Sequence, residues 1–158
     1  MLYSIDTSGL LDGWKRRYPP DVFPIIWDNL TDLIESGSLI STDEVLTELK
    51  AGDDDIYLWA SEREKMFLPL DAEIQQAVTD VLARHSSWIP QDRSRNMADP
   101  FVIAVAIARC CTVVSAETLS TSPKPERVKI PNVCNTFGIR HIEFLDLMRE
   151  QGWVFTRR

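Results

Sequence analysis

The sequence NMADPFVIAVAIARCCTVVSAE, residues Asn96–Glu117, decides the fold class of this chain. An acid, Asp99, opens a segment that is apolar on nearly every side, and the β-branched segment Thr112–Val114 follows and leads to a second acid, Glu117. A helix that is apolar all round is buried, and such a β-branched run belongs inside a sheet. The stretch predicts an α/β protein with both acids at element ends, where α/β proteins keep their chemistry.

Composition fits one soluble globular domain. The chain has 158 residues, of which 44% are hydrophobic and 26% charged, so we expect residues 1–158 to form a single domain. Asp6 interrupts the N-terminal apolar stretch, which argues against a secretory leader, and the apolar run Phe101–Ala108 is too short to cross a bilayer. The three cysteines are an odd number without CxxC spacing, which disfavours zinc and favours a reduced, cytoplasmic protein.

The charge balance leaves the partner open. The net charge is −7, from 17 Lys and Arg against 24 Asp and Glu. This argues against nonspecific binding of nucleic acid, which depends on neutralising phosphates. The argument weakens if several carboxylates hold divalent cations, because the metal then inverts the local charge.

A third acid follows the first predicted strand. Residues Leu2–Ile5 (LYSI) are expected to form this strand, and Asp6 comes directly after it, before the small residues Thr7, Ser8 and Gly9. An acid at a strand end is suited to a functional site in an α/β fold. The structural alternative is that Asp6 only forms an Asx turn or caps the next helix.

The fourth acid lies on a helix that follows a short apolar strand, Leu39-Ile40. Ser41 and Glu44 have the S-x-x-E spacing of a capping box, which is the structural interpretation of Glu44. Glu48 lies one turn later on the same face, near the buried edge of its helix, and is less easily explained as a solvated charge. Asp99 has a structural alternative too, because an acid followed by Pro100 is typical of an N-cap.

The remaining elements complete an alternating pattern of strands and helices. It predicts a parallel sheet with helices on both faces, which places the acids that follow strands at one edge. We expect the further strands at Met66–Leu70 and Trp153–Thr156, and the further helices at Leu10–Trp14, Phe23–Ile34, Ile56–Lys65, from Asp71 to near Trp88, at Pro131–Phe137 and at Ile142–Met148.

Two of three basic segments, the first two named here, are either solvated surface or contacts for RNA phosphates. The three segments are the triplet Lys15-Arg16-Arg17, the polar segment Gln91–Asn96 with Arg93 and Arg95, and the Ser/Thr/Pro-rich segment after Glu117, with Lys124, Arg127 and Lys129.

Four carboxylates gathered in one dry cleft repel each other unless divalent cations neutralise them. Ligation by oxygen alone suits Mg²⁺ or Mn²⁺. Such metals activate a water molecule and stabilise in-line attack on a phosphodiester.

At these residues the chain resembles the PIN-domain superfamily, which includes the VapC-like toxin ribonucleases, and more nearly a poorly characterised PIN-like branch. The segments that carry the superfamily resemblance are Ile5–Leu11 (IDTSGLL), Glu48–Gly52 (ELKAG), Asp99–Ala104 (DPFVIA) and Val114–Glu117 (VSAE). The segments typical of the branch are Pro19–Trp27 and Lys129–Cys134.

The resemblance implies a three-layer fold with a mostly parallel sheet of about five strands, in the order 3-2-1-4-5, between helices. It implies a metal-dependent endoribonuclease that binds Mg²⁺ or Mn²⁺, acts as a toxin restrained by an antitoxin protein, forms a homodimer and has no membrane association. The implied ligands are Asp6, Glu48, Asp99 and Glu117, with Glu44 as a further candidate, and Ser8 would hydrogen-bond a ligand or the attacking water.

Two observations keep an alternative open. Glu117 stands where the superfamily usually has Asp or Asn, and the net charge is acidic. A catalytically inactive PIN-like module that binds RNA or protein is consistent with both. A receiver-like phospho-acceptor domain is disfavoured, because neither Asp6 nor Glu117 has the companion acid and late lysine that such a site needs.

Overall fold

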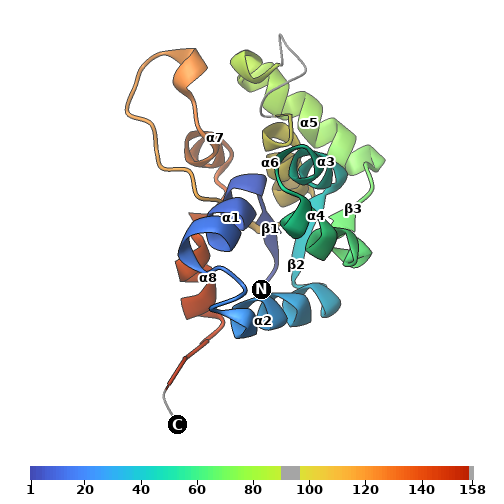
Figure 1. The fold of residues 1–158 in the computed structure, drawn as a ribbon. Helices are drawn as coiled ribbons and strands as arrows, with labels where there is room; N and C mark the ends of the chain where they lie inside the picture. Colours follow the sequence, from blue (N-terminus) through green and yellow to red (C-terminus); the bar gives the residue numbers. More distant parts are fainter. Residues whose placement is uncertain (90–96, 157–158) are drawn as a thin grey trace.

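Every strand of the central sheet runs parallel to its neighbours. In the computed structural model, which describes residues 1–89 and 97–156, five strands pair in the order β3-β2-β1-β4-β5 (Figure 1). The strands are β1 (Tyr3–Ile5), β2 (Leu39–Thr42), β3 (Phe67–Leu68), β4 (Thr112–Val114) and β5 (His141–Ile142). The predicted order is confirmed, and all carboxyl ends of the strands meet at one edge.

Helices connect the strands, as parallel pairing requires. In the described part of the chain the α-helices are α1 (Thr7–Asp12), α2 (Pro24–Glu35), α3 (Asp43–Gly52), α4 (Asp54–Ser61), α5 (Ala72–Arg84), α6 (Asp99–Arg109), α7 (Ile130–Phe137) and α8 (Phe144–Glu150). Shorter helical segments are η1 (Gly13–Arg17), η2 (Glu64–Met66), η3 (Ser86–Trp88) and η4 (Pro125–Arg127). No helix in these ranges has the length and apolarity to span a bilayer.

The helices cover both faces of the sheet. Successive side chains of a strand point to opposite faces. Accordingly, the Ser4 hydroxyl donates to the Val102 carbonyl of α6, whereas the Tyr3 hydroxyl donates to Glu150 of α8. Figure 1 shows α1 and α8 on one side of β1 and α5 on the other. This arrangement confirms the three-layer α/β fold class expected for a PIN-like chain.

The core sits on these two faces. All three residues of β1 are fully buried, as are Val102 and Ile103 of α6, so the apolar helix predicted from the sequence lies against the sheet. On the opposite face, aromatic rings of η1, α2, α4 and α8 pack with centroids 4.6–6.0 Å apart. These rings belong to Trp14, Trp27, Trp59 and Phe144.

The capping box predicted for α3 is wrong. Ser41 is a residue of β2, and its buried hydroxyl donates to the Ile5 carbonyl at 2.7 Å. The helix begins later, at Asp43, with Thr42 as an N-cap that makes no side-chain hydrogen bond. Pairing of β2 with β1 and β3 therefore extends the strand over the residue that local chemistry assigned to a cap.

The N-cap predicted at Asp99 is also wrong. The N-cap residue of α6 is Ala98, and Asp99 is the first residue of the helix, followed by Pro100. Proline is tolerated in a first turn because amides there have no intrahelical partner. The carboxylate of Asp99 therefore does not serve as the cap of α6.

The fifth strand lies earlier than predicted. The Val113 amide donates to the Arg140 carbonyl and the Ser115 amide to the Ile142 carbonyl, at 2.9 and 3.2 Å. This pairing makes His141–Ile142 the strand beside β4. Residues 153–156 form no strand and follow a left-handed turn at Gly152, whose φ is 65°.

Truncating the buried face of α6 is expected to destabilise the chain. Ile103→Ala removes a fully buried side chain and should lower the free energy of unfolding by about 2–5 kcal/mol, through lost burial and the cavity left behind. Ile25→Ala, at a side chain that is 51% exposed, is the matched control and should cost about 1 kcal/mol or less. Urea unfolding followed by circular dichroism measures both, and equal losses would contradict the placement of α6.

Candidate carboxylate site

Asp6 lies at the carboxyl end of β1 and is buried, with 2% of its surface exposed. Its amide donates to the Val114 carbonyl of β4 at 2.9 Å, so β1 and β4 hold its backbone. Its Oδ2 accepts the Ser8 amide at 2.9 Å and caps α1. Its Oδ1 is buried and has no hydrogen-bond partner among the described residues. Such an orphaned oxygen costs free energy unless a ligand or a proton satisfies it.

Asp99 lies in the first turn of α6 and is 9% exposed. No hydrogen bond to its carboxylate occurs within residues 1–89 and 97–156. The helix N-terminus favours a negative charge there, but burial opposes it. Asp99 is therefore a second carboxylate that is buried and has no donor in the described part of the chain.

Glu48 reaches the same region from α3 and is fixed at both oxygens. Its Oε2 accepts the Thr7 hydroxyl at 2.5 Å, and its Oε1 accepts the Ala98 amide at 3.1 Å. Thr7 follows Asp6 and Ala98 precedes Asp99. Glu48 thus ties together the two segments that carry the buried acids.

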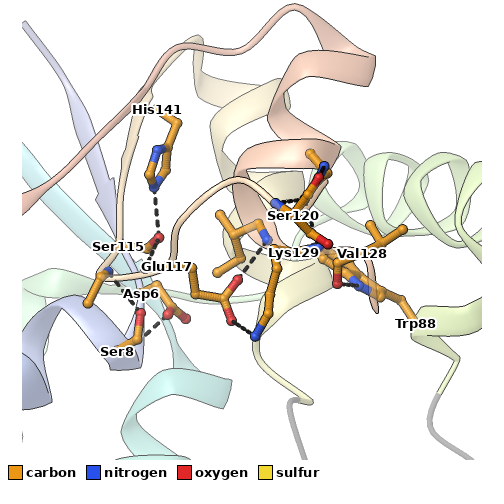
Figure 2. A network of polar contacts seen from close by, with 12 residues as sticks. Asp6, Ser8, Trp88, Ser115, Glu117, Ser120, Val128, Lys129 and His141 are labelled. Atoms are coloured by element: carbon orange, nitrogen blue, oxygen red, sulfur yellow. Dashed lines mark hydrogen bonds and ion pairs between the residues drawn. The ribbon is translucent and has the colours of Figure 1, made fainter. Parts of the chain in front are cut away.

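Glu117 follows β4 and faces α7 (Figure 2). Its Oε2 accepts the Ile130 amide at 2.7 Å, and its Oε1 lies 3.8 Å from Nζ of Lys129. Its side chain is 18% exposed. The extra methylene of a glutamate reaches these donors at the start of α7, where the helix dipole favours a negative charge.

Two serine hydroxyls hold the short segment that leads from β4 to Glu117. The Ser8 hydroxyl accepts the Ala116 amide at 3.1 Å, and the Ser115 hydroxyl accepts the Glu117 amide at 3.2 Å. The Ser115 oxygen also lies 2.8 Å from Nε2 of His141 on β5. These bonds, drawn in Figure 2, link the ends of β4 and β5 to α1.

Burial is the main electrostatic influence on the two aspartates. It raises the pKa of Asp6, the negative charges of Glu48 and Glu117 raise it further, and hydrogen bonds from Ser8 oppose the shift. Burial also raises the pKa of Asp99, with the charge of Asp6 as the next cause. Glu117 and Glu48 act in the same direction on Asp99, and Lys129 opposes them. The charges of Asp6, Glu48 and Glu117, the other three acids predicted from the sequence, thus all act on Asp99.

The carboxylate oxygens of these acids suit a hard divalent cation, although the side chains are not arranged as a complete set of metal ligands. All four acids offer oxygen ligands, which Mg²⁺ and Mn²⁺ prefer, and Oδ1 of Asp6 is a buried acceptor with no donor among residues 1–89 and 97–156. In the described ranges, however, no group of three or more His, Cys, Asp or Glu side chains is arranged to hold a metal. Mg²⁺ keeps several waters and needs only one or two carboxylates, so Asp6 and Asp99 fit it.

Glu44, the further candidate, lies elsewhere. It lines a separate pocket with residues of β3, α5 and α6, among them Leu68, Ile74 and Phe101. Its charge is not among the influences on Asp6 or Asp99. The structure therefore does not bring Glu44 to the other acids.

The sequence did not single out several residues of this site. They are Thr7, which holds Glu48, Ser115 and His141, which hold the segment after β4, and Lys129, the nearest cation to Glu117. Thr7 stands inside the motif around Asp6, and Lys129 was noted only as part of a basic segment. The contacts of Ser115 with His141 join β4 to β5, so no local signal marks them.

Two of the three cations in the basic triplet before Pro19 form ion pairs. Lys15 pairs with Asp53 at 3.0 Å and Arg17 pairs with Asp12 at 2.6 Å. These pairs lower the number of cations available to RNA. The other predicted contacts, Arg93 and Arg95, lie outside the described residues.

The fold and the site define a three-layer α/β domain with a carboxylate cluster at the carboxyl edge of its parallel sheet. The chain belongs to the family described as a domain of unknown function (DUF4411), whose model matches residues 3–155. No curated protein matches the chain.

The raised pKa of Asp99 predicts a pH-dependent gain of stability in Asp99→Asn. Above about pH 4 the unfolded chain loses the Asp99 proton, whereas the folded chain retains it until its higher pKa, so wild-type stability falls as pH rises through that window. In chelator, urea unfolding should show the variant on the order of 1 kcal/mol or more above wild type at about pH 8 and close to wild type at about pH 4.

Asp28→Asn, at an exposed acid of α2, controls for the loss of one charge and should show no such pH-dependent difference. If Asp99→Asn is less stable than wild type at the higher pH, the ionised carboxylate is stabilising and the description of the site is wrong.

Proposed function

We propose that this chain is a Mg²⁺- or Mn²⁺-dependent endoribonuclease that hydrolyses phosphodiester bonds of RNA. The observation that carries the proposal is the pair of buried aspartates at the carboxyl edge of the sheet. Among the described residues Asp6 has an orphaned oxygen and Asp99 has no donor, and the charge of Asp6 acts on Asp99. A structural role would give such groups donors, whereas a metal site needs them free.

The residues divide into ligands and supports. Asp6 and Asp99 would hold the cation, with Glu48 and Glu117 at its periphery. When bound, a divalent cation neutralises the clustered charge and makes water a competent nucleophile towards phosphorus. The Ser8 amide fixes Oδ2 of Asp6 and leaves Oδ1 facing the site. Thr7 and the Ala98 amide hold Glu48 between the two aspartate-bearing segments.

RNA as substrate, and a role as a toxin, rest on the resemblance to PIN-domain ribonucleases. In its support, the charges of the other three motif acids all act on Asp99, and the fold class agrees with the resemblance. An antitoxin protein and a second copy of the chain would then be the protein partners. A cytoplasmic location is supported by Cys110, Cys111 and Cys134, which are all free thiols.

A second candidate function is a PIN-like module that binds RNA or protein without catalysis. The observation that favours it is the engagement of Glu48 and Glu117 by backbone amides and, for Glu117, by Lys129. Two of the four acids are then satisfied by the protein itself.

Substitution of either aspartate should remove metal-dependent cleavage. Asp6→Asn and Asp99→Asn keep the size of the side chain and remove the charge that holds the cation. Each should lower the rate of Mn²⁺-dependent cleavage of a fluorescent single-stranded RNA by about a hundredfold or more. Glu44→Gln is the matched control, since Glu44 lies in another pocket, and should retain the wild-type rate.

Circular dichroism must show folded variants before the rates are compared. Cleavage that persists in both aspartate variants, or that is lost equally in Glu44→Gln, would refute the assignment of the site.

Metal binding separates the enzyme from the non-catalytic module. Isothermal titration of the wild-type chain with Mn²⁺ should give saturable binding, because the cation relieves repulsion between Asp6 and Asp99. Asp99→Asn should abolish this heat, and Glu44→Gln should leave it unchanged. A wild-type chain that does not bind Mn²⁺ would favour the non-catalytic module.

A further inference from the structure

The segment between Glu117 and α7 forms an open hollow of about 520 Å³ that adjoins the carboxylate site. We call residues 118–129 the basic loop. The residues that line the hollow are Thr118, Leu119, Ser120, Thr121, Ser122, Lys124, Arg127 and Lys129. The lining is thus made of hydroxyl groups and cations, with one apolar side chain and no acid.

Two of the three cations of the basic loop have no acidic partner among the described residues. Within the described residues, neither Lys124 nor Arg127 forms an ion pair, whereas Lys15 and Arg17 of the other basic segment both do. Lys129 connects the hollow to the site, because its Nζ lies 3.8 Å from Oε1 of Glu117. The basic loop carries three cations and one acid, Glu126, so it is locally positive in a chain of net charge −7.

Two serine hydroxyls of the basic loop accept backbone amides and keep their own protons free to donate. Oγ of Ser120 accepts the Ser122 amide at 3.3 Å, and Oγ of Ser122 accepts the Lys124 amide at 3.3 Å. A serine hydroxyl has one proton to donate, and these bonds do not use it. Hydroxyl protons and free cations together are the groups that contact phosphate oxygens.

The loop is held in place at both ends. Asn132 of α7 bonds Ser120 twice, through its Oδ1 at 3.0 Å and its Nδ2 at 2.9 Å. On the other side, the Trp88 indole donates to the Val128 carbonyl at 3.3 Å and the Ser87 hydroxyl to the Pro125 carbonyl at 2.9 Å. Figure 2 shows Ser120 and the contact of Trp88 with Val128 on the same side of the site as Lys129. A hollow held in this way loses little conformational entropy when a ligand binds.

We propose that the hollow of the basic loop binds backbone phosphates of an RNA strand next to the bond that the carboxylate site cleaves. RNA as the ligand rests on the proposed function, while the phosphate chemistry rests on the lining. The loop places its cations on one side of the acids. An RNA strand bound in the hollow would pass Lys129 and then reach Asp6 and Asp99. The acidic net charge is then compatible with RNA binding, because the contact is local.

Binding without catalysis tests the proposal. Fluorescence anisotropy of a labelled single-stranded RNA of mixed sequence, in chelator and over a series of KCl concentrations, reports affinity and its salt dependence. Lys124→Ser/Arg127→Ser should weaken binding on the order of tenfold at low salt, and should lower the salt slope by about one to two, since two phosphate contacts are lost.

A variant of equal charge provides the control. Lys65→Ser/Arg149→Ser removes two cations that are 67% and 69% exposed and paired with Glu35 and Asp146, and it changes the net charge by the same amount. This variant should bind within about twofold of wild type, because surface pairs of this kind contribute little to the fold. Equal losses in the two variants would show a general charge effect and overturn the proposal.

The outcomes distinguish this inference from the proposed function. If the loop variant binds RNA normally while Asp99→Asn has lost cleavage, the inference fails and the enzyme assignment stands. If the loop variant loses binding in chelator while no chain cleaves RNA, the inference stands and catalysis fails. If wild type does not bind RNA but binds an acidic polypeptide through Lys124 and Arg127, the loop is a protein-binding surface and the inference is overturned.

Discussion

The buried carboxylates of Asp6 and Asp99 repel each other. The contacts around them at the carboxyl edge of the sheet hold the two groups in place despite this repulsion. Burial raises the pKa of both groups, so the folded chain carries an unfavourable interaction that a proton or a divalent cation relieves. The fold supports the pair without neutralising it. Glu48 holds the two aspartate-bearing segments together, and Ser8 binds only one oxygen of Asp6. Proteins retain such strain where function needs it.

Parallel pairing converts separate acids into one site. Residues of β1 and β4 are in register, with Ile5 opposite Val114, so the chain leaves both strands at the same level and Asp6 comes close to the segment of Glu117. The helices bring the other two acids, Glu48 from α3 and Asp99 from α6. The same segment continues as the basic loop, so acids and cations lie side by side although the chain as a whole is acidic. The local distribution of charge, and not its sum, decides what such a surface can bind.

Local chemistry predicted most elements but failed where tertiary pairing competed with it. Asp53 and Asp71 are N-caps, and Gly138 ends α7 in the left-handed conformation, as the residue types indicate. Ser41 also looked like a cap, yet β2 extends over it. Asp99 looked like the cap of α6, yet it is the first residue of that helix and Ala98 is the cap. The fifth strand was misplaced because Trp153–Thr156 has the better strand composition, whereas His141–Ile142 lies where β4 needs a partner.

The sequence by itself determined the class of fold and indicated which acids could meet. The apolar segment after Asp99 must be buried, alternating strands and helices require a parallel sheet, and acids that follow parallel strands meet at one edge. The tertiary structure alone decided how the acids are used. It gave amide donors to Glu48 and Glu117, left Oδ1 of Asp6 without a donor among the described residues, and placed Glu44 in another pocket. The physical reason is that hydrogen-bond satisfaction and desolvation depend on segments distant in sequence, which no local pattern records.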